Sequence, residues 1–225
     1  MIFYIMGKSA SGKDKIYGIL SQSPALALKK IILYTTRPIR EKETDGVQYH
    51  FVTPEVLEEF RKQGKVIEQR DYQTVAGVWS YATIDDGSVK LDKEPSAAGN
   101  ECPAKDEESF ESENSPETIP NPTSENYIAI GTLDSYRKIR DYYGADNIFP
   151  IYIEVEDGER LARALKREKK QALPNYQELC RRFLADCEDF SEENIRSAGI
   201  SRRFDNTGEL AVCLKEVEEA ITSVL

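Results

Sequence analysis

The feature that most limits the fold of this 225-residue chain is a glycine-rich segment directly after an apolar N-terminal run. Residues 2–6 read Ile-Phe-Tyr-Ile-Met, and the sequence Gly-Lys-Ser-Ala-Ser-Gly-Lys-Asp follows at residues 7–14. A strand, G-x-x-x-x-G-K and then a helix is the setting in which backbone N–H groups and a helix N-terminus surround a phosphate. The pattern predicts a nucleotide phosphate site, and the alternative is a Gly/Ser turn that only caps a helix. The predicted ATP-binding residues of this loop are Gly7, Ser9, Ala10, Ser11, Gly12, Lys13 and Asp14.

Asp14 stands where this loop usually carries Ser or Thr, whose hydroxyl ligates Mg²⁺. A carboxylate is also a hard oxygen ligand, so we expect Asp14 as a candidate Mg²⁺ ligand. The alternative is that the acid only stabilises the positive end of the helix that it opens.

Apolar strand-like runs alternate with helix-like segments along the rest of the chain. Strands are expected at residues 1–6, 31–34, 47–52, 66–72, 78–84, 127–130 and 148–155, and helices at 13–20, 54–63, 133–143, 157–171, 175–190 and 210–224. Buried strands that alternate with helices favour an α/β fold with a parallel sheet covered by helices on both faces. We therefore expect a single domain over residues 1–225.

Residues 88–126 interrupt this alternation with an acidic, proline-containing segment. Between residues 92 and 125 there are ten acidic residues, two basic residues and five of the ten prolines, with few large apolar side chains. Such a composition cannot offset the entropy of ordering by burial, so the segment is predicted to be a disordered insertion. It is either a surface loop without function or an electrostatic element that screens a basic cleft or recruits a partner.

The composition argues against several classes of protein. The net charge of −10 disfavours DNA or RNA binding, and no apolar stretch approaches the 18 residues of a membrane span. Cys102, Cys180, Cys187 and Cys213 lack the spacing of a zinc site or a disulfide framework, so we expect a reducing, cytoplasmic setting. With His50 as the single histidine and no G-x-S-x-G elbow, Ser-His or Cys-His catalysis is improbable.

A second phosphate site is predicted after the residue 31–34 run. Arg37 and Arg40, three residues apart around Pro38, offer forked donors to a phosphate monoester, and Tyr49 follows on an expected strand. The run T-T-R-x-x-R…D-G-x-x-Y-x-F-V after an N-terminal phosphate loop resembles the guanylate kinase family. The resemblance is firmest over residues 1–72, and it implies a P-loop fold with a small mixed monophosphate-binding subdomain at residues 35–86 and a helical lid.

The resemblance implies Mg²⁺-dependent phosphoryl transfer from ATP to GMP, giving ADP and GDP. Arg37, Arg40 and Tyr49 would then bind the GMP phosphate, and Glu68 would accept hydrogen bonds from the donor edge of guanine. Ser80-Tyr81-Ala82-Thr83 resembles the family's Tyr-Tyr-Gly-Thr, which places Tyr81 toward the phosphate and Thr83 toward the base.

The lid is expected at residues 157–182. Arg163 and Arg167, four residues apart on one helix, and Arg182 on the next would close over the phosphates as catalytic cations, together with Lys13. The alternative is a solvated charged face in which these arginines pair with nearby glutamates. Asn206 resembles the asparagine near the adenine site, and an Asx-turn is the alternative.

The chain also departs from the family pattern. Where the family carries Asp-x-Asp-x-Gln-Gly, this sequence has Ile130-Gly131-Thr132-Leu133-Asp134, and Leu33 replaces a serine that reads the base. Phosphate contacts are thus kept while base contacts are partly lost. Two alternatives to GMP phosphorylation follow: a P-loop kinase for another phosphorylated acceptor, such as a sugar phosphate, or a non-catalytic binding module. The sequence does not indicate an oligomeric state.

Overall fold

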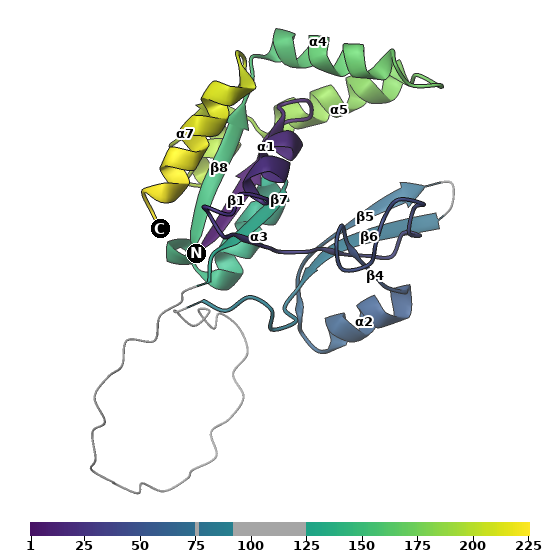
Figure 1. Ribbon diagram of the computed structural model, residues 1–225. Coiled ribbons are helices and arrows are strands. Elements are labelled where there is room, and N and C mark those ends of the chain that lie inside the picture. Colours follow the sequence, from purple (N-terminus) through teal and green to yellow (C-terminus); the bar gives the residue numbers. More distant parts are fainter. Residues whose placement is uncertain (75–76, 92–124) are drawn as a thin grey trace, which may run out of the picture.

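Two separate β-sheets organise the computed structural model, which describes residues 1–74, 77–91 and 125–225 (Figure 1). The larger sheet carries the phosphate loop, and the smaller one lies to its side (Figure 1). No helix within the described ranges is long and apolar enough to cross a membrane. The disordered insertion predicted at residues 88–126 lies outside the described residues, apart from its ends at 88–91 and 125–126.

The larger sheet is parallel throughout, with the strand order β2-β7-β1-β8-β9. Its central strand β1 is aligned with β7 and β8, so that Ile2 lies opposite both Tyr127 and Ile148. The strands are β1 (Ile2–Met6), β2 (Lys29–Lys30), β7 (Tyr127–Gly131), β8 (Ile148–Glu154) and β9 (Arg203–Asp205).

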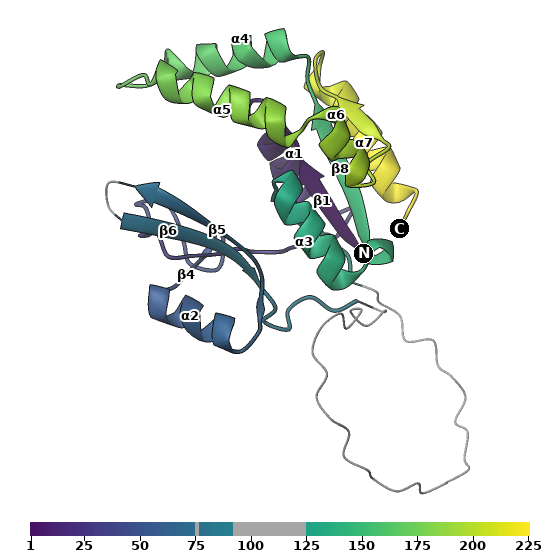
Figure 2. The same cartoon turned by 180° about the vertical axis from the view of Figure 1, so that it is seen from behind.

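Alternate side chains of β1 supply the cores on the two faces of this sheet. Ile2, Tyr4 and Met6 join one cluster, which packs against α3 (Leu133–Tyr143) and α6 (Glu192–Ser197). Phe3 and Ile5 join the other, which packs against α1 (Lys13–Leu20) and α7 (Leu210–Thr222). Opposite views show helices on either side of β1 and β8 (Figure 2). The predicted parallel sheet with both faces covered is therefore confirmed.

The smaller sheet is mixed and has the order β4-β3-β6-β5. Its longest pair is the antiparallel hairpin of β5 (Val66–Thr74) and β6 (Gly77–Ile84), in which Glu68 lies opposite Thr83. The remaining strands are β3 (Tyr34–Thr35) and β4 (His50–Phe51). Helix α2 (Pro54–Lys62) begins as predicted, since the Thr53 hydroxyl accepts a hydrogen bond from the Val56 N–H.

Two predicted strands are wrong in extent. The run at residues 31–34 is not one strand, because the chain passes there from the larger sheet to the smaller, with Lys29–Lys30 in one and Tyr34–Thr35 in the other. Ile31 still packs into the larger core, which explains the apolar run. The strand expected at 47–52 is reduced to His50–Phe51, since Gly46 turns with φ of +75° and the Asp45 carboxylate accepts the Phe51 N–H.

The remaining helices form a pair that extends from the larger sheet. Helix α4 (Asp157–Glu168) and α5 (Tyr176–Asp189) lie side by side at its end, as both views show (Figures 1 and 2). They are slightly shorter than predicted because the turn around Pro174 takes residues from both. Three short elements were not predicted: the 3₁₀ turn η1 (Ala145–Asn147), α6 and β9.

Candidate active site

The phosphate loop between β1 and α1 has a backbone that requires its two glycines. Gly12 has φ of +87°, and a Cβ there would lie 2.4 Å from Asn206 Nδ2. A Cβ on Gly7 would lie 2.5 Å from the carbonyl oxygen of Ile153 on β8. Both distances are too short for any larger residue without movement of the surroundings. The two glycines therefore let the loop backbone lie close to its neighbours, as the glycine-rich pattern predicts.

Asn206 supports this loop from within the protein. Its side chain is buried, and Nδ2 donates a hydrogen bond of 2.7 Å to the Ser11 carbonyl. Its own backbone N–H donates to the carbonyl of Glu154 at the end of β8. These contacts make Asn206 a residue that positions the loop, and its place near the adenine site stays a prediction. In the described part of the chain, Ser11 Oγ is buried without a hydrogen-bond partner.

Lys13 and Asp14 stand at the start of α1 and line a cavity beside the loop. Lys13 Nζ lies 3.6 Å from the Asp14 carboxylate, whose side chain is 84% exposed. The cavity has a volume of about 680 Å³ and reaches from these two residues to Tyr49 and Tyr81 of the smaller sheet. It thus connects the phosphate loop with two of the residues assigned to the monophosphate.

Arg37 is fixed by a partner that the sequence reasoning missed. The guanidinium, in a residue only 4% exposed, donates forked hydrogen bonds of 2.7 and 2.6 Å to the two carboxylate oxygens of Glu43. It also lies 5.0 Å from the centre of the Tyr49 ring. The hydrogen bonds from Arg37 lower the pKa of the Glu43 carboxyl to about 2. Glu43 lies only three residues beyond Arg40. Its closeness in the sequence could therefore have predicted an arginine–carboxylate pair within this loop.

Arg40 differs from Arg37 because its side chain is exposed and it contributes only its backbone N–H to Glu43. The structure therefore separates the two predicted phosphate-binding arginines. Arg37 is braced within the loop, while Arg40 projects from it.

Glu68 and Thr83 meet in a buried polar cluster between the smaller sheet and α3. Thr83 Oγ1 donates to Glu68 Oε1 at 3.0 Å, and Ser135 Oγ of α3 donates to Glu68 Oε2 at 3.2 Å. Arg70 Nε lies 3.3 Å from the same carboxylate. Burial, reinforced by the charge of Glu68, raises the pKa of the Tyr4 hydroxyl. Arg70 and Ser135 were not predicted, although Arg70 stands two residues from Glu68, on the same face of a strand.

The three predicted lid arginines do not share one environment. Arg163 donates to the Glu159 carboxylate at 2.7 Å and to the Thr207 carbonyl at 2.9 Å. Arg167 and Arg182 instead line a smaller cavity of about 230 Å³ between α4 and α5, which Ser9 of the phosphate loop also borders. Arg182 donates to Glu178 within α5. The structure thus brings Arg167 and Arg182 to the loop and directs Arg163 toward the turn after β9.

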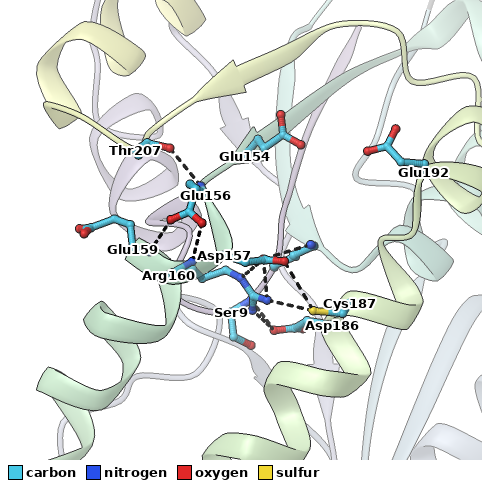
Figure 3. Close-up of polar contacts among 12 residues, drawn as sticks. Ser9, Glu154, Glu156, Asp157, Glu159, Arg160, Asp186, Cys187, Glu192 and Thr207 are labelled. Atoms are coloured by element: carbon cyan, nitrogen blue, oxygen red, sulfur yellow. Dashed lines mark hydrogen bonds and ion pairs between the residues drawn. The ribbon is translucent and has the colours of Figure 1, made fainter.

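A buried arginine that the sequence did not single out joins the helical pair to the loop. Arg160 is 1% exposed and lies 2.9 Å from Asp157 and 3.3 Å from Asp186 (Figure 3). Its guanidinium also lies 3.9 Å from the centre of the Phe183 ring. Asp186 Oδ2 also accepts the backbone N–H of Ser9 at 2.8 Å. Although burial opposes ionisation of Asp157, the hydrogen bonds from Arg160 and Lys8 lower the pKa of its carboxyl.

Comparisons with known proteins agree with this arrangement. The guanylate kinase family model matches residues 2–87, which hold the loop, Arg37, Arg40, Tyr49 and Glu68. The guanylate kinase of Aliivibrio fischeri is 34% identical over 91 residues, covering 38% of this chain and 44% of that protein. That of Listeria monocytogenes is 35% identical over 72 residues, covering 32% and 35%. The chain thus matches less than half the length of these relatives.

The fold itself is shared over a longer range. The crystal structure of guanylate kinase from Anaplasma phagocytophilum matches with a TM-score of 0.51 and 14% identity, over all of this chain and 85% of that one. The family match covers the phosphate loop and all four strands of the smaller sheet, while the likeness in fold extends beyond residue 87. This chain thus shares with guanylate kinases the sequence pattern of residues 2–87 and the overall fold.

Proposed function

We propose that this chain transfers the terminal phosphoryl group of ATP to the phosphate of a nucleoside monophosphate, with GMP as the acceptor that its relatives suggest. The observation that carries the proposal is the cavity that is lined both by Lys13 of the phosphate loop and by Tyr49 and Tyr81 of the second predicted phosphate site. A kinase needs its two phosphate sites within one enclosed space, so that the acceptor oxygen can approach the transferred group in line.

In this proposal, the phosphate loop holds ATP and residues 35–86 hold the acceptor. The backbone of the loop and Lys13 bind the ATP phosphates, and Arg40 and Tyr49 bind the acceptor phosphate. Arg167 and Arg182, which already border a cavity with Ser9, supply positive charge from the lid at residues 157–182. Closure of such a lid would also exclude water, which otherwise competes as the acceptor.

The residues at the loop fit a magnesium ion bound together with the nucleotide. Mg²⁺ is usually held by one or two carboxylates plus substrate phosphates, and Asp14 offers one exposed carboxylate on the cavity wall. Groups of three or more His, Cys, Asp or Glu that could hold a metal by themselves are absent from the described ranges. When bound, Mg²⁺ neutralises charge on the phosphate oxygens, while Lys13 orients them.

The test of the proposal is ADP release from Mg·ATP in the presence of GMP, dGMP, AMP, UMP or CMP, with a control lacking an acceptor. We expect turnover with GMP to exceed turnover with UMP and CMP, because a purine fills more of a cavity of about 680 Å³. We expect it to exceed turnover with AMP because the relatives of this chain are guanylate kinases. ATP binding without turnover on any acceptor would move the assignment to another phosphorylated acceptor. Absence of ATP binding would favour the non-catalytic module.

Arg40→Ala should raise the KM for the monophosphate by about tenfold, the size of one charge-assisted hydrogen bond, while the KM for ATP stays within about twofold. Arg40 is the better position for this measurement, because Arg37 is buried against Glu43 and its loss would also disturb the loop. Lys42→Ala is the matched control, an exposed cation two residues along the same loop. An equal rise in both KM values would show that the two substrate sites are assigned wrongly.

A further inference from the structure

The carboxylate expected to read guanine already has its oxygens engaged by the protein. Glu68 Oε1 accepts Thr83 Oγ1 at 3.0 Å and lies 3.5 Å from Arg70 Nη2. Glu68 Oε2 accepts Ser135 Oγ at 3.2 Å and lies 3.3 Å from Arg70 Nε. The side chain of Glu68 is fully buried. A carboxylate has about four acceptor positions, so little capacity remains for the N–H groups of a base.

Arg70 stands between this carboxylate and the large cavity. Glu68 and Arg70 lie on the same face of β5, two residues apart, and Arg70 lines the cavity together with Thr132, whereas Glu68 and Thr83 do not. Within the described part of the chain, Glu68 is the one ionic partner of the guanidinium. An arginine has five N–H donors, so donors remain for a ligand.

The charged residues of the cavity wall also favour a ligand that accepts hydrogen bonds. Its basic residues are Lys13, Lys30 and Arg70, and its one acidic residue is Asp14, which lies at the phosphate-loop end. The wall also carries apolar and aromatic residues, among them Leu33, Ile130 and Trp79, and Tyr81 lies opposite Arg70 on β6. A flat ring therefore has a surface to pack on, but its edge meets donors rather than a free carboxylate.

We infer that Arg70 is the specificity-determining residue of the acceptor site, which takes a phosphorylated ring presenting oxygen acceptors in preference to the amine edge of guanine. Because Arg70 binds the Glu68 carboxylate, a ligand in the cavity meets the N–H donors of Arg70 and not the hydrogen-bond acceptors of Glu68. The inference rests on the proposed phosphoryl transfer for the existence of an acceptor site, and it changes only which acceptor fits best. GMP remains acceptable through its O6, while its N2 amine has no free partner.

The matched pair of probes is GMP and xanthosine monophosphate, which share the ring and the phosphate but carry an amine or an oxygen at position 2. Binding is measured by calorimetry without ATP, so that the result does not depend on turnover. We expect the xanthosine nucleotide to bind the wild-type protein about tenfold more tightly than GMP, the size of one charge-assisted hydrogen bond gained. In Arg70→Ala, Glu68 is released and the preference should turn toward GMP.

Two further variants keep the test decisive if Arg70→Ala folds poorly. Glu68→Gln retains Arg70, so it should keep the preference for the xanthosine nucleotide. Arg61→Ala, an exposed arginine on α2 outside the cavity, should leave both affinities unchanged. Tighter binding of GMP by the wild type, or selective loss of GMP in Glu68→Gln, would overturn the inference. Binding of neither nucleotide would instead overturn the proposed acceptor site itself.

Discussion

Replacing Lys13 with alanine should lower kcat/KM by about 10²- to 10³-fold, the cost of removing one cation or donor that meets charge in the transition state. Lys13 follows Gly12 at the first position of α1 and lines the large cavity. Little covalent chemistry is asked of a phosphoryl-transfer enzyme, so fixed positive charge carries much of the catalysis.

The melting temperature of this variant should stay within about 2 °C of the wild type. The contact of Lys13 with Asp14 is long, at 3.6 Å, and exposed pairs contribute about 1 kcal/mol at most. Lys15→Ala, an exposed lysine two residues further on the same helix, should change neither quantity. A Lys13→Ala enzyme with nearly full turnover would remove the ATP site from the phosphate loop.

Arg160→Ala should destabilise the protein by about 2–3 kcal/mol, because it removes the charge-assisted hydrogen bonds of a buried guanidinium to Asp157 and Asp186. The change also removes the stacking of the guanidinium on Phe183, 3.9 Å from the ring centre. For a chain of this size we expect a fall in melting temperature of about 10 °C.

Thermal or urea unfolding measures this loss of stability, and Arg181→Ala is the matched control. Arg181 lies on α5, is largely exposed and pairs only with Glu178 among the described residues, so its loss should cost about 1 kcal/mol or less. If the two variants lost equal stability, the cluster around Arg160 would not be a structural junction between the helical pair and the loop.

Local signals in the sequence were sufficient for several elements. Helix α3 occupies the predicted residues 133–143, because Thr132 caps its first turn and Gly144 follows its last residue. The loop at residues 7–14 was predictable because its glycines serve a backbone requirement that hardly depends on the rest of the fold. The apolar run at 31–34 misled the prediction, since hydrophobicity records burial and does not show which of two sheets receives a residue.

The hydrogen-bond and ion-pair partners of Arg160 and Glu68 could not be predicted from the sequence, for a different reason. Arg160 lies on an amphipathic helix, where an arginine is normally expected at the surface because buried arginines are rare. Its two carboxylate partners are 3 and 26 residues away, and only the packing of α4 on α5 brings Asp186 to it. Likewise Ser135 reaches Glu68 across 67 residues. Such long-range pairs leave no periodic trace in the sequence.

The parallel order of the larger sheet has a consequence for how the protein is made. Strand β1 leaves the ribosome before its partners β7 and β8, which begin only at residues 127 and 148. The five buried residues of β1 therefore remain unpaired in the sheet until β7, at residues 127–131, has been synthesised. Pairings this distant in sequence slow folding and leave an apolar strand open to aggregation in the meantime. The phosphate loop packs closely against β8 at Gly7 and is hydrogen-bonded by Asn206, so it can take its final form only after residue 206 has been synthesised.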